Sequence, residues 1–188
     1  YSGLKRTLES IEQQRESEQF QHVIIDGFST DSSISLITDY VSRNQSVVWI
    51  SERDAGIYNA MNKGISLATG KFISFLNSGD ELAGPDCLKD VLYHLEAYGG
   101  CDILYGNIDI IAPSGKVKRR WHSGEFQTYK LWVGWMPPHP MFTVRSELIT
   151  EQFGFNEEFS IAADYDLCLR LLLKSDICVF YLDKTLVR

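Results

Sequence analysis

The fold class is decided by the stretch His22-Val23-Ile24-Ile25-Asp26-Gly27-Phe28-Ser29-Thr30-Asp31. A short apolar run that ends in an acid and a turn-rich loop is typical of a buried strand followed by a helix. Outward from this stretch, strands and helices alternate over the first half of the chain. Strands are expected at 22–26, 47–50 and 71–76, and helices at 4–11, 34–41, 56–68 and 85–95. This alternation predicts an α/β fold, with a mostly parallel sheet flanked by helices.

The second half of the chain has a different pattern. We expect strands at 102–105, 107–111, 116–121, 141–145 and 177–181, and a helix at 165–174. A turn at 113–115 predicts a hairpin, and tryptophans gather between positions 121 and 135. Since no linker or repeat interrupts the 188 residues, we predict one domain with an antiparallel, aromatic-rich second half.

The composition excludes several classes of protein. A formal net charge of −7 argues against a dedicated nucleic-acid binder, and no apolar run is long enough to span a bilayer. The four cysteines lack zinc-site spacing and are too few for a disulfide scaffold, so a reduced, cytoplasmic setting is expected. The basic run at 116–120 is most often a solvated hairpin edge. The alternative is a guide for a phosphorylated substrate or an anionic membrane surface.

Three acids follow predicted strands of the first half, namely Asp26, Asp54 and Asp80. The carboxyl ends of parallel strands form the usual ligand edge of an open α/β sheet. Carboxylates crowded there need a cation or hydrogen-bond donors to offset their charge. The alternative is that each acid caps the helix that follows it. No GxGxxG or GxSxG motif is present, which argues against a dinucleotide site and a serine nucleophile.

Four motifs together resemble those of family-2 glycosyltransferases. They are V-I-I-D-G-F-S-T-D at 23–31, E-R-D-A-G-I-Y-N-A-M-N-K-G-I at 52–65, F-L-N-S-G-D at 75–80 and A-D-Y-D-L at 163–167. They occur in the family's order, and the second is long and specific. The chain is most similar to bacterial polysaccharide enzymes such as the colanic-acid biosynthesis group. The resemblance implies a GT-A fold and transfer from a nucleotide sugar with inversion.

The chain departs from the family pattern in two places. The family normally has a strand and loop before the helix expected at 4–11, so we expect an N-terminally truncated chain in which Tyr1 is not the native start. Within the motifs, Asn77 and Gly79 replace acids of the family's metal-binding sequence, and Ala163 replaces a glutamate.

The resemblance assigns roles to the acidic residues. It implies that Asp164 is the catalytic base, with Asp166 ranked second, and that Asp80 is the metal ligand for Mg²⁺ or Mn²⁺. A carboxylate is needed to accept the proton of the attacking hydroxyl, and a cation would stabilise the leaving diphosphate. Without the resemblance, the residues alone favour Asp164 as the N-cap of the final helix, and the two roles are compatible. Asp26 and Asp54 are expected near the nucleotide base and ribose.

Other substrate contacts have plain structural alternatives. Lys63 is expected at the diphosphate, but a solvated helix lysine is equally compatible with the sequence. Trp135 and His139 are expected to line the acceptor site, and the alternative is a packed aromatic wall. Residues 1–100 would form the nucleotide-sugar-binding half of the single domain and residues 101–188 the acceptor and catalytic half.

The sequence therefore predicts a metal-dependent inverting glycosyltransferase. Its partners would be a nucleotide-sugar donor and a saccharide or lipid-linked acceptor, with no nucleic acid. We expect it in the cytoplasm, with peripheral association at the inner face of the membrane; no oligomeric state is predicted. The alternatives are a sugar nucleotidyltransferase and a non-catalytic module that binds a nucleotide or sugar.

Overall fold

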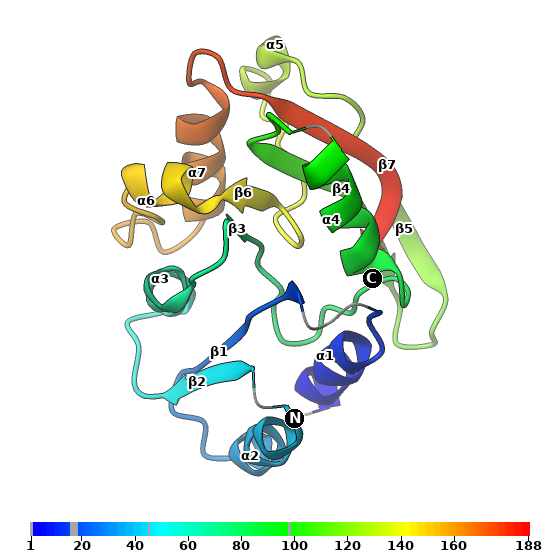
Figure 1. The fold of residues 1–188 in the computed structure, drawn as a ribbon, viewed down its shortest axis with the longest axis vertical. Coiled ribbons are helices and arrows are strands. Elements are labelled where there is room, and N and C mark those ends of the chain that lie inside the picture. The colour runs from blue at the N-terminus through cyan, green and yellow to red at the C-terminus, as the bar shows by residue number, and fades with distance from the viewer. Residues whose placement is uncertain (1, 16–18, 45, 98) are drawn as a thin grey trace.

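The computed structural model describes residues 2–15, 19–44, 46–97 and 99–188, so Tyr1 lies outside the described residues. The first half forms a two-stranded parallel sheet of β1 (His22–Asp26) and β2 (Val47–Ser51), paired from His22 with Val47 to Asp26 with Ser51 (Figure 1). Both strands match the predicted ranges to within one residue.

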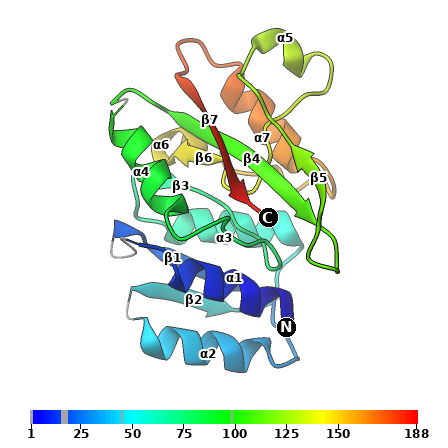
Figure 2. The same ribbon diagram turned by 90° about the vertical axis from the view of Figure 1, so that its right-hand side faces the viewer.

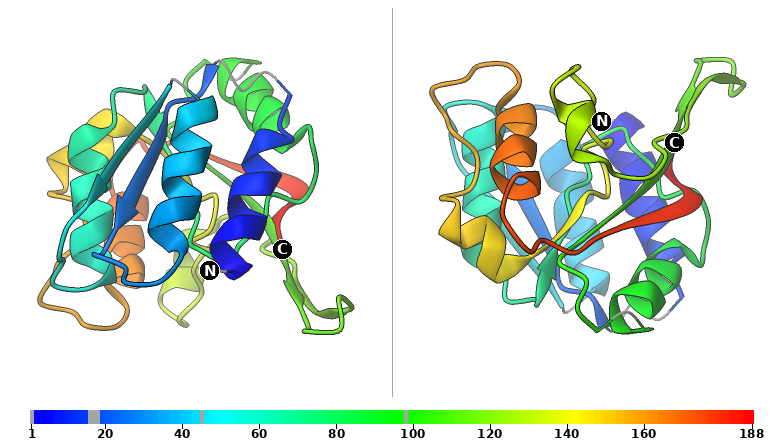
Figure 3. Two further views of the ribbon diagram at one scale, coloured as in Figure 1. Left: turned by 90° about the horizontal axis from the view of Figure 1, so that it is seen from below. Right: turned by 90° about the horizontal axis from the view of Figure 1, so that it is seen from above.

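Helices cover both faces of this small sheet. Helices α1 (Ser2–Glu12) and α2 (Ser33–Arg43) lie on one face, and α3 (Ile57–Leu67) lies on the other, between the two sheets (Figures 2 and 3). The helical spacing of apolar residues places one face of α1 and of α2 against the sheet. Their shared core consists of Leu8, Ile24, Ile37 and Tyr40.

A second, mixed sheet forms most of the rest of the molecule. Its strands are β3 (Phe72–Ile73), β6 (Thr143–Arg145), β4 (Ile103–Ile111), β5 (Val117–Trp121) and β7 (Val179–Val187). Strand β4 is central, because it pairs antiparallel with β5 and β6 and parallel with β7. The hairpin of β4 and β5 projects from the body of the molecule (Figure 3).

The prediction of one mostly parallel sheet is wrong. The strand expected at 71–76 forms only at 72–73, and it pairs antiparallel with β6 rather than joining β1. Two hydrogen bonds next to the strand support this pairing. Ser74 Oγ lies 2.7 Å from Thr143 Oγ1, and the Met141 backbone N–H donates to the Phe75 carbonyl at 2.9 Å. The local sequence pattern predicts that a strand forms here. Contacts with distant segments decide which strand it pairs with.

Strand β4 runs unbroken through Gly106, where two separate strands were expected. A Cβ on Gly106 would lie 2.6 Å from Leu186 Cγ and 2.8 Å from the Lys184 carbonyl oxygen. The absence of a side chain therefore lets β7 approach closely. The parallel pairing of β7 corrects the expectation of a wholly antiparallel second half.

Two helices sandwich the mixed sheet (Figure 2). On one face, α4 (Cys87–Ala97) packs with Leu104; on the other, α7 (Ala163–Leu172) packs with Ile103 and Tyr105. This division follows the alternation of side chains along a strand. Short helices α5 (Thr128–Leu131) and α6 (Ser146–Glu151) were not predicted. Within the described residues, no helix is long and apolar enough to cross a bilayer.

Candidate functional site

The carboxyl end of β1 presents a buried, well-bonded carboxylate. Asp26 is 7% exposed, and its Oδ2 accepts hydrogen bonds from Ser51 Oγ at 2.6 Å and from the Ser29 N–H at 3.0 Å. Burial alone would raise the pKa of Asp26, but the hydrogen bonds from Ser29 and Ser51 outweigh it and lower the pKa. Asp26 is therefore an ionised acceptor at neutral pH.

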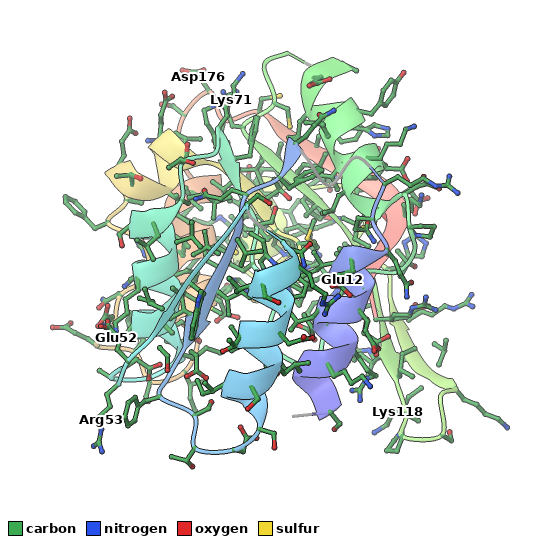
Figure 4. All side chains as sticks on the ribbon, turned by 60° about the horizontal axis from the view of Figure 1, so that its bottom comes forward. Glu12, Glu52, Arg53, Lys71, Lys118 and Asp176 are labelled. Carbon is green, nitrogen blue, oxygen red and sulfur yellow. The ribbon has the colours of Figure 1, made fainter. Side chains whose placement is uncertain are left out.

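Asp54 lies next to the Asp26 loop, as the parallel pairing of β1 and β2 predicts. Its Oδ1 accepts the Gly56 N–H at 3.1 Å, and its Oδ2 would lie 2.6 Å from a Cβ on Gly27. Only glycine at position 27 permits this close approach without movement. Figure 4 shows Glu52 and Arg53 at this end of the molecule, away from Lys71.

Lys63 holds the loop that contains Asp54. Its Nζ lies 2.8 Å from Glu52 Oε1 and donates to the Arg53 carbonyl at 2.9 Å, and its side chain is 21% exposed. The lysine therefore has a structural task between β2 and α3, in contrast to the solvated lysine that was the alternative. Its contact with a diphosphate stays a prediction.

A cavity of about 300 Å³ joins the two halves of the chain. Its polar lining includes Asp164 and His139, which were predicted for the site, and Asn77 from the loop before Asp80. The whole lining consists of Ile57, Tyr58, Met61, Asn77, Ile108, Trp121, Met136, Pro138, His139, Pro140 and Asp164. The cavity is thus mostly apolar with a few polar groups, as is usual for small-molecule sites.

Asp164 enters this cavity from the first turn of α7. Its Oδ1 accepts hydrogen bonds from the Tyr165 N–H at 3.0 Å and from the Tyr58 hydroxyl at 3.3 Å. The N-cap of α7 is Ala162, which has a φ of 69°, so the alternative reading of Asp164 as the N-cap is wrong. A carboxylate in the first turn is still stabilised by the helix dipole.

Asp166, the second-ranked base, has a structural partner. Arg170 Nε donates to Asp166 Oδ2 at 2.9 Å, and the same guanidinium donates to the carbonyls of Gln152 and Gly154. Asp166 is absent from the cavity lining. The geometry therefore favours Asp164 over Asp166 as the carboxylate that meets a ligand.

His139 lines the cavity and has one unsatisfied ring nitrogen. Its ring stacks on Phe75, with centroids 5.3 Å apart, and meets the edge of Phe155 at 5.5 Å. His139 Nε2 is buried and has no hydrogen-bond partner among the described residues. Burial lowers the pKa of His139, although the nearby charge of Asp164 opposes the shift. The ring is therefore neutral at pH 7 and has one hydrogen bond left to make.

The strand-end acids do not form a shared cation site. Among the described ranges, no group of three or more His, Cys, Asp or Glu side chains is placed to hold a metal ion. Asp26 is hydrogen-bonded to Ser29 and to Ser51 on β2. Asp54 is bonded to Gly56 and Asp80 to Asn77, and the loop of Asp80 follows β3, which belongs to the other sheet. The expectation that Asp26, Asp54 and Asp80 gather around one cation is therefore wrong.

Asp80 is still suited to bind a metal ion whose other ligands are not protein side chains. Its Oδ2 accepts a long hydrogen bond from the Asn77 N–H at 3.3 Å. Burial raises the pKa of Asp80, and the backbone and side-chain hydrogen bonds with Asn77 oppose this shift without outweighing it. A bound cation would stabilise the ionised form of Asp80, which burial disfavours. Mg²⁺ commonly uses one or two carboxylates and completes its shell with phosphate oxygens and water.

Trp135 packs in an aromatic wall and is not among the residues that line the cavity. Its Nε1 donates to the Ser123 carbonyl at 3.2 Å, its ring meets Tyr105 edge-on, and Lys130 Nζ lies 5.5 Å from the ring centroid. Trp121 borders the cavity in its place.

Sequence reasoning assigned no role to Tyr58, Met136 or Trp121, all of which line the cavity. For Tyr58 a signal existed, since it lies within the long motif at 52–65. For Met136 and Trp121, only the folding of distant segments reveals their place.

Comparisons with known proteins identify the family and the fold of the chain. The family model for "Glycosyl transferase family 2" matches residues 1–172. An uncharacterized glycosyltransferase of Mycobacterium tuberculosis is 32% identical over 91% of this chain and 64% of its own length. The PGL/p-HBAD biosynthesis glycosyltransferase of Mycobacterium bovis is 29% identical over 89% of this chain and 63% of its own length. The chain thus spans a little under two thirds of these relatives.

Solved structures also share the fold, and TarS and PcManGT are two of them. Staphylococcus aureus TarS in complex with UDP-GlcNAc has a TM-score of 0.75 at 20% identity, over 98% of this chain and 53% of its own. The mannosyltransferase PcManGT from Pyrobaculum calidifontis, in complex with GDP-Man and Mn²⁺, has a TM-score of 0.72 at 14% identity, over 99% of this chain and 52% of its own. Since the family model covers most of the sequence, this chain belongs to glycosyl transferase family 2.

Proposed function

We propose that this protein transfers a sugar from a nucleoside-diphosphate sugar to a hydroxyl of a saccharide or lipid-linked acceptor, with inversion at the transferred carbon. The observation that supports this most directly is the cavity that Asp164 and a neutral His139 both line, together with Asn77 from the loop of Asp80. One of the two relatives above is named for PGL/p-HBAD biosynthesis, and neither is named for colanic acid. We therefore propose a bacterial surface glycoconjugate as the product and no narrower group.

In the proposed reaction, Asp164 is the general base. As the acceptor hydroxyl attacks the anomeric carbon of the donor, its proton moves to the Asp164 carboxylate and the bond to the diphosphate breaks. Attack from the face opposite the leaving group inverts the configuration. No covalent bond to the protein is needed, so one base suffices.

We place the donor at the carboxyl ends of β1 and β2. Asp26, which is held ionised by Ser29 and Ser51, and Asp54 would accept hydrogen bonds from the nucleotide base and ribose. Lys63 would reach the diphosphate only by sharing its contacts with Glu52 and Arg53. In this scheme residues 1–100 bind the donor.

Asp80 is the residue that would hold Mg²⁺ or Mn²⁺. When bound, such a cation supplies positive charge that stabilises the departing diphosphate. The Mn²⁺ in the PcManGT complex supports the use of a divalent cation in this fold, and the choice of Asp80 as its ligand is our proposal.

Residues 101–188 form the acceptor half in this proposal. His139 would bind an acceptor hydroxyl, and Trp135, which does not line the cavity itself, would support the aromatic wall behind it. The exposed basic hairpin at 116–120 would guide the protein to anionic lipid at the inner face of the membrane, where lipid-linked acceptors are found.

A donor screen tests the proposal and separates it from its alternatives. We expect UDP or GDP, with Mn²⁺, to raise the melting temperature, and the matching nucleotide sugar to release nucleoside diphosphate slowly even without acceptor. Release of pyrophosphate from a nucleoside triphosphate and a sugar phosphate would instead indicate a nucleotidyltransferase. Nucleotide binding without turnover of any donor would indicate a non-catalytic module.

His139→Ala should weaken acceptor binding. The buried Nε2 has no protein partner, so its natural partner is a hydroxyl that enters the cavity. Loss of one such hydrogen bond should raise the acceptor KM about tenfold and leave the donor KM unchanged. Steady-state kinetics with each substrate varied in turn measures both values. An unchanged acceptor KM would assign His139 to packing against Phe75 alone.

A further inference from the structure

Tyr58 connects the long motif to the carboxylate of Asp164 across 106 positions of sequence. Its hydroxyl donates to Asp164 Oδ1 at 3.3 Å, and the Tyr165 N–H donates to the same oxygen at 3.0 Å. No described residue hydrogen-bonds Asp164 Oδ2. One oxygen of the carboxylate is therefore anchored, and the other is available to a ligand in the cavity that Tyr58 and Asp164 both line.

The Tyr58 ring is held by contacts that do not involve its hydroxyl. It stacks on Phe155, with centroids 5.6 Å apart and an interplanar angle of 22°. Phe155 in turn meets the edge of Phe75 at 5.2 Å. Because this aromatic packing fixes the ring, removal of the hydroxyl alone should leave the ring in place.

Asn62, one helical turn after Tyr58, clamps the segment that contains Phe155. Its Oδ1 accepts the Phe155 N–H at 2.8 Å, and its Nδ2 donates to the Phe155 carbonyl at 2.9 Å and to Glu157 Oε1 at 2.7 Å. Residues four apart share one face of a helix, so the stack and the clamp act on the same segment. Gly154 allows the approach, since a Cβ there would lie 2.4 Å from Asn62 Oδ1.

We infer that Tyr58 is a positioning residue for Asp164: its hydroxyl fixes one carboxylate oxygen so that the other faces the attacking hydroxyl, while Asn62 holds the Phe155 stack that places Tyr58. The inference rests on the proposed role of Asp164 as the base. It gives the motif at 52–65 a second task, because the helix that follows Asp54 also orients the carboxylate of α7. A base held in its reactive orientation needs less reorganisation when the acceptor attacks.

Tyr58→Phe tests this role without disturbing the packing. We expect kcat to fall at least tenfold, since a hydrogen bond to a carboxylate is lost, with the KM values for donor and acceptor unchanged. The melting temperature should stay close to that of the unmodified protein. Tyr93→Phe is the matched control, because Tyr93 lies 65% exposed on α4 and should keep full activity after the same chemical change.

A double variant separates this inference from the proposed function. If Tyr58 acts through Asp164, Tyr58→Phe combined with Asp164→Asn should be no slower than Asp164→Asn alone. Further loss in the double variant would overturn the inference, as would an unchanged kcat in Tyr58→Phe when Asp164→Asn is inactive. Full activity of Asp164→Asn would instead overturn the base assignment itself, and the inference with it.

Discussion

Asp164→Asn should lower kcat by about 10²- to 10⁴-fold, the range typical for removal of a general base. The amide keeps the shape and the hydrogen-bond acceptor for Tyr165 and Tyr58 but accepts no proton from the attacking hydroxyl. Nucleotide binding should persist, because Asp26 and Asp54 lie on other loops. Turnover with saturating substrates and nucleotide affinity by calorimetry measure the two effects separately.

Asp166→Asn is the matched control for this prediction. It makes the same chemical change two residues away, at a carboxylate that pairs with Arg170 and lies outside the cavity lining. We expect a modest loss of stability and little change in kcat. If Asp164→Asn turned over donor at the normal rate, or if Asp166→Asn were the inactive variant, Asp164 would not be the base.

His22 should make the fold sensitive to mild acid. Its Nδ1 lies 3.0 Å from the Tyr40 hydroxyl, and burial lowers its pKa from 6.5 to about 4. The unfolded chain binds a proton near pH 6.5, whereas the folded protein resists it until about pH 4. Stability is therefore full above pH 6.5 and is lost as the pH falls through this window. We expect a loss of about 2 kcal/mol between pH 7 and pH 5 from this residue.

Urea unfolding of the protein and of His22→Phe at the two pH values measures this contribution. Phenylalanine keeps an aromatic edge against Tyr40 but does not titrate. Between pH 7 and pH 5, the His22→Phe variant should lose about 2 kcal/mol less stability than the unmodified protein, because the carboxylates contribute equally to both proteins. An equal acid sensitivity in the two proteins would show that His22 is already protonated in the folded state or is not the cause.

The elements of the first half were predictable from the sequence because each depends on local patterning. The apolar run before Asp26 and the helical spacing after Asp31 fix a strand and a helix whatever lies around them. The acid at the end of β1 and the proximity of Asp54 follow from parallel pairing. Asp164 and His139 were also predicted, and they line one cavity.

The short third strand shows where local patterning stops being sufficient. Residues 71–76 predict a strand, but pairing with β6 depends on contacts such as Ser74 with Thr143, about 70 positions apart. This choice of partner divides the expected sheet in two. It also explains why Asp26 and Asp80 are held in separate loops rather than around one cation.

By itself, the sequence determined β1, β2 and the helices of the first half, because these depend on spacing along the chain. It also determined the family motifs and the chemical types of the residues in them. Only the tertiary structure decided that Tyr58 touches Asp164, that Asn62 grips Phe155 and that Trp121 rather than Trp135 borders the cavity. The first two contacts join residues that are 106 and 93 positions apart. They are selected by packing against the whole core, a property that no local pattern contains.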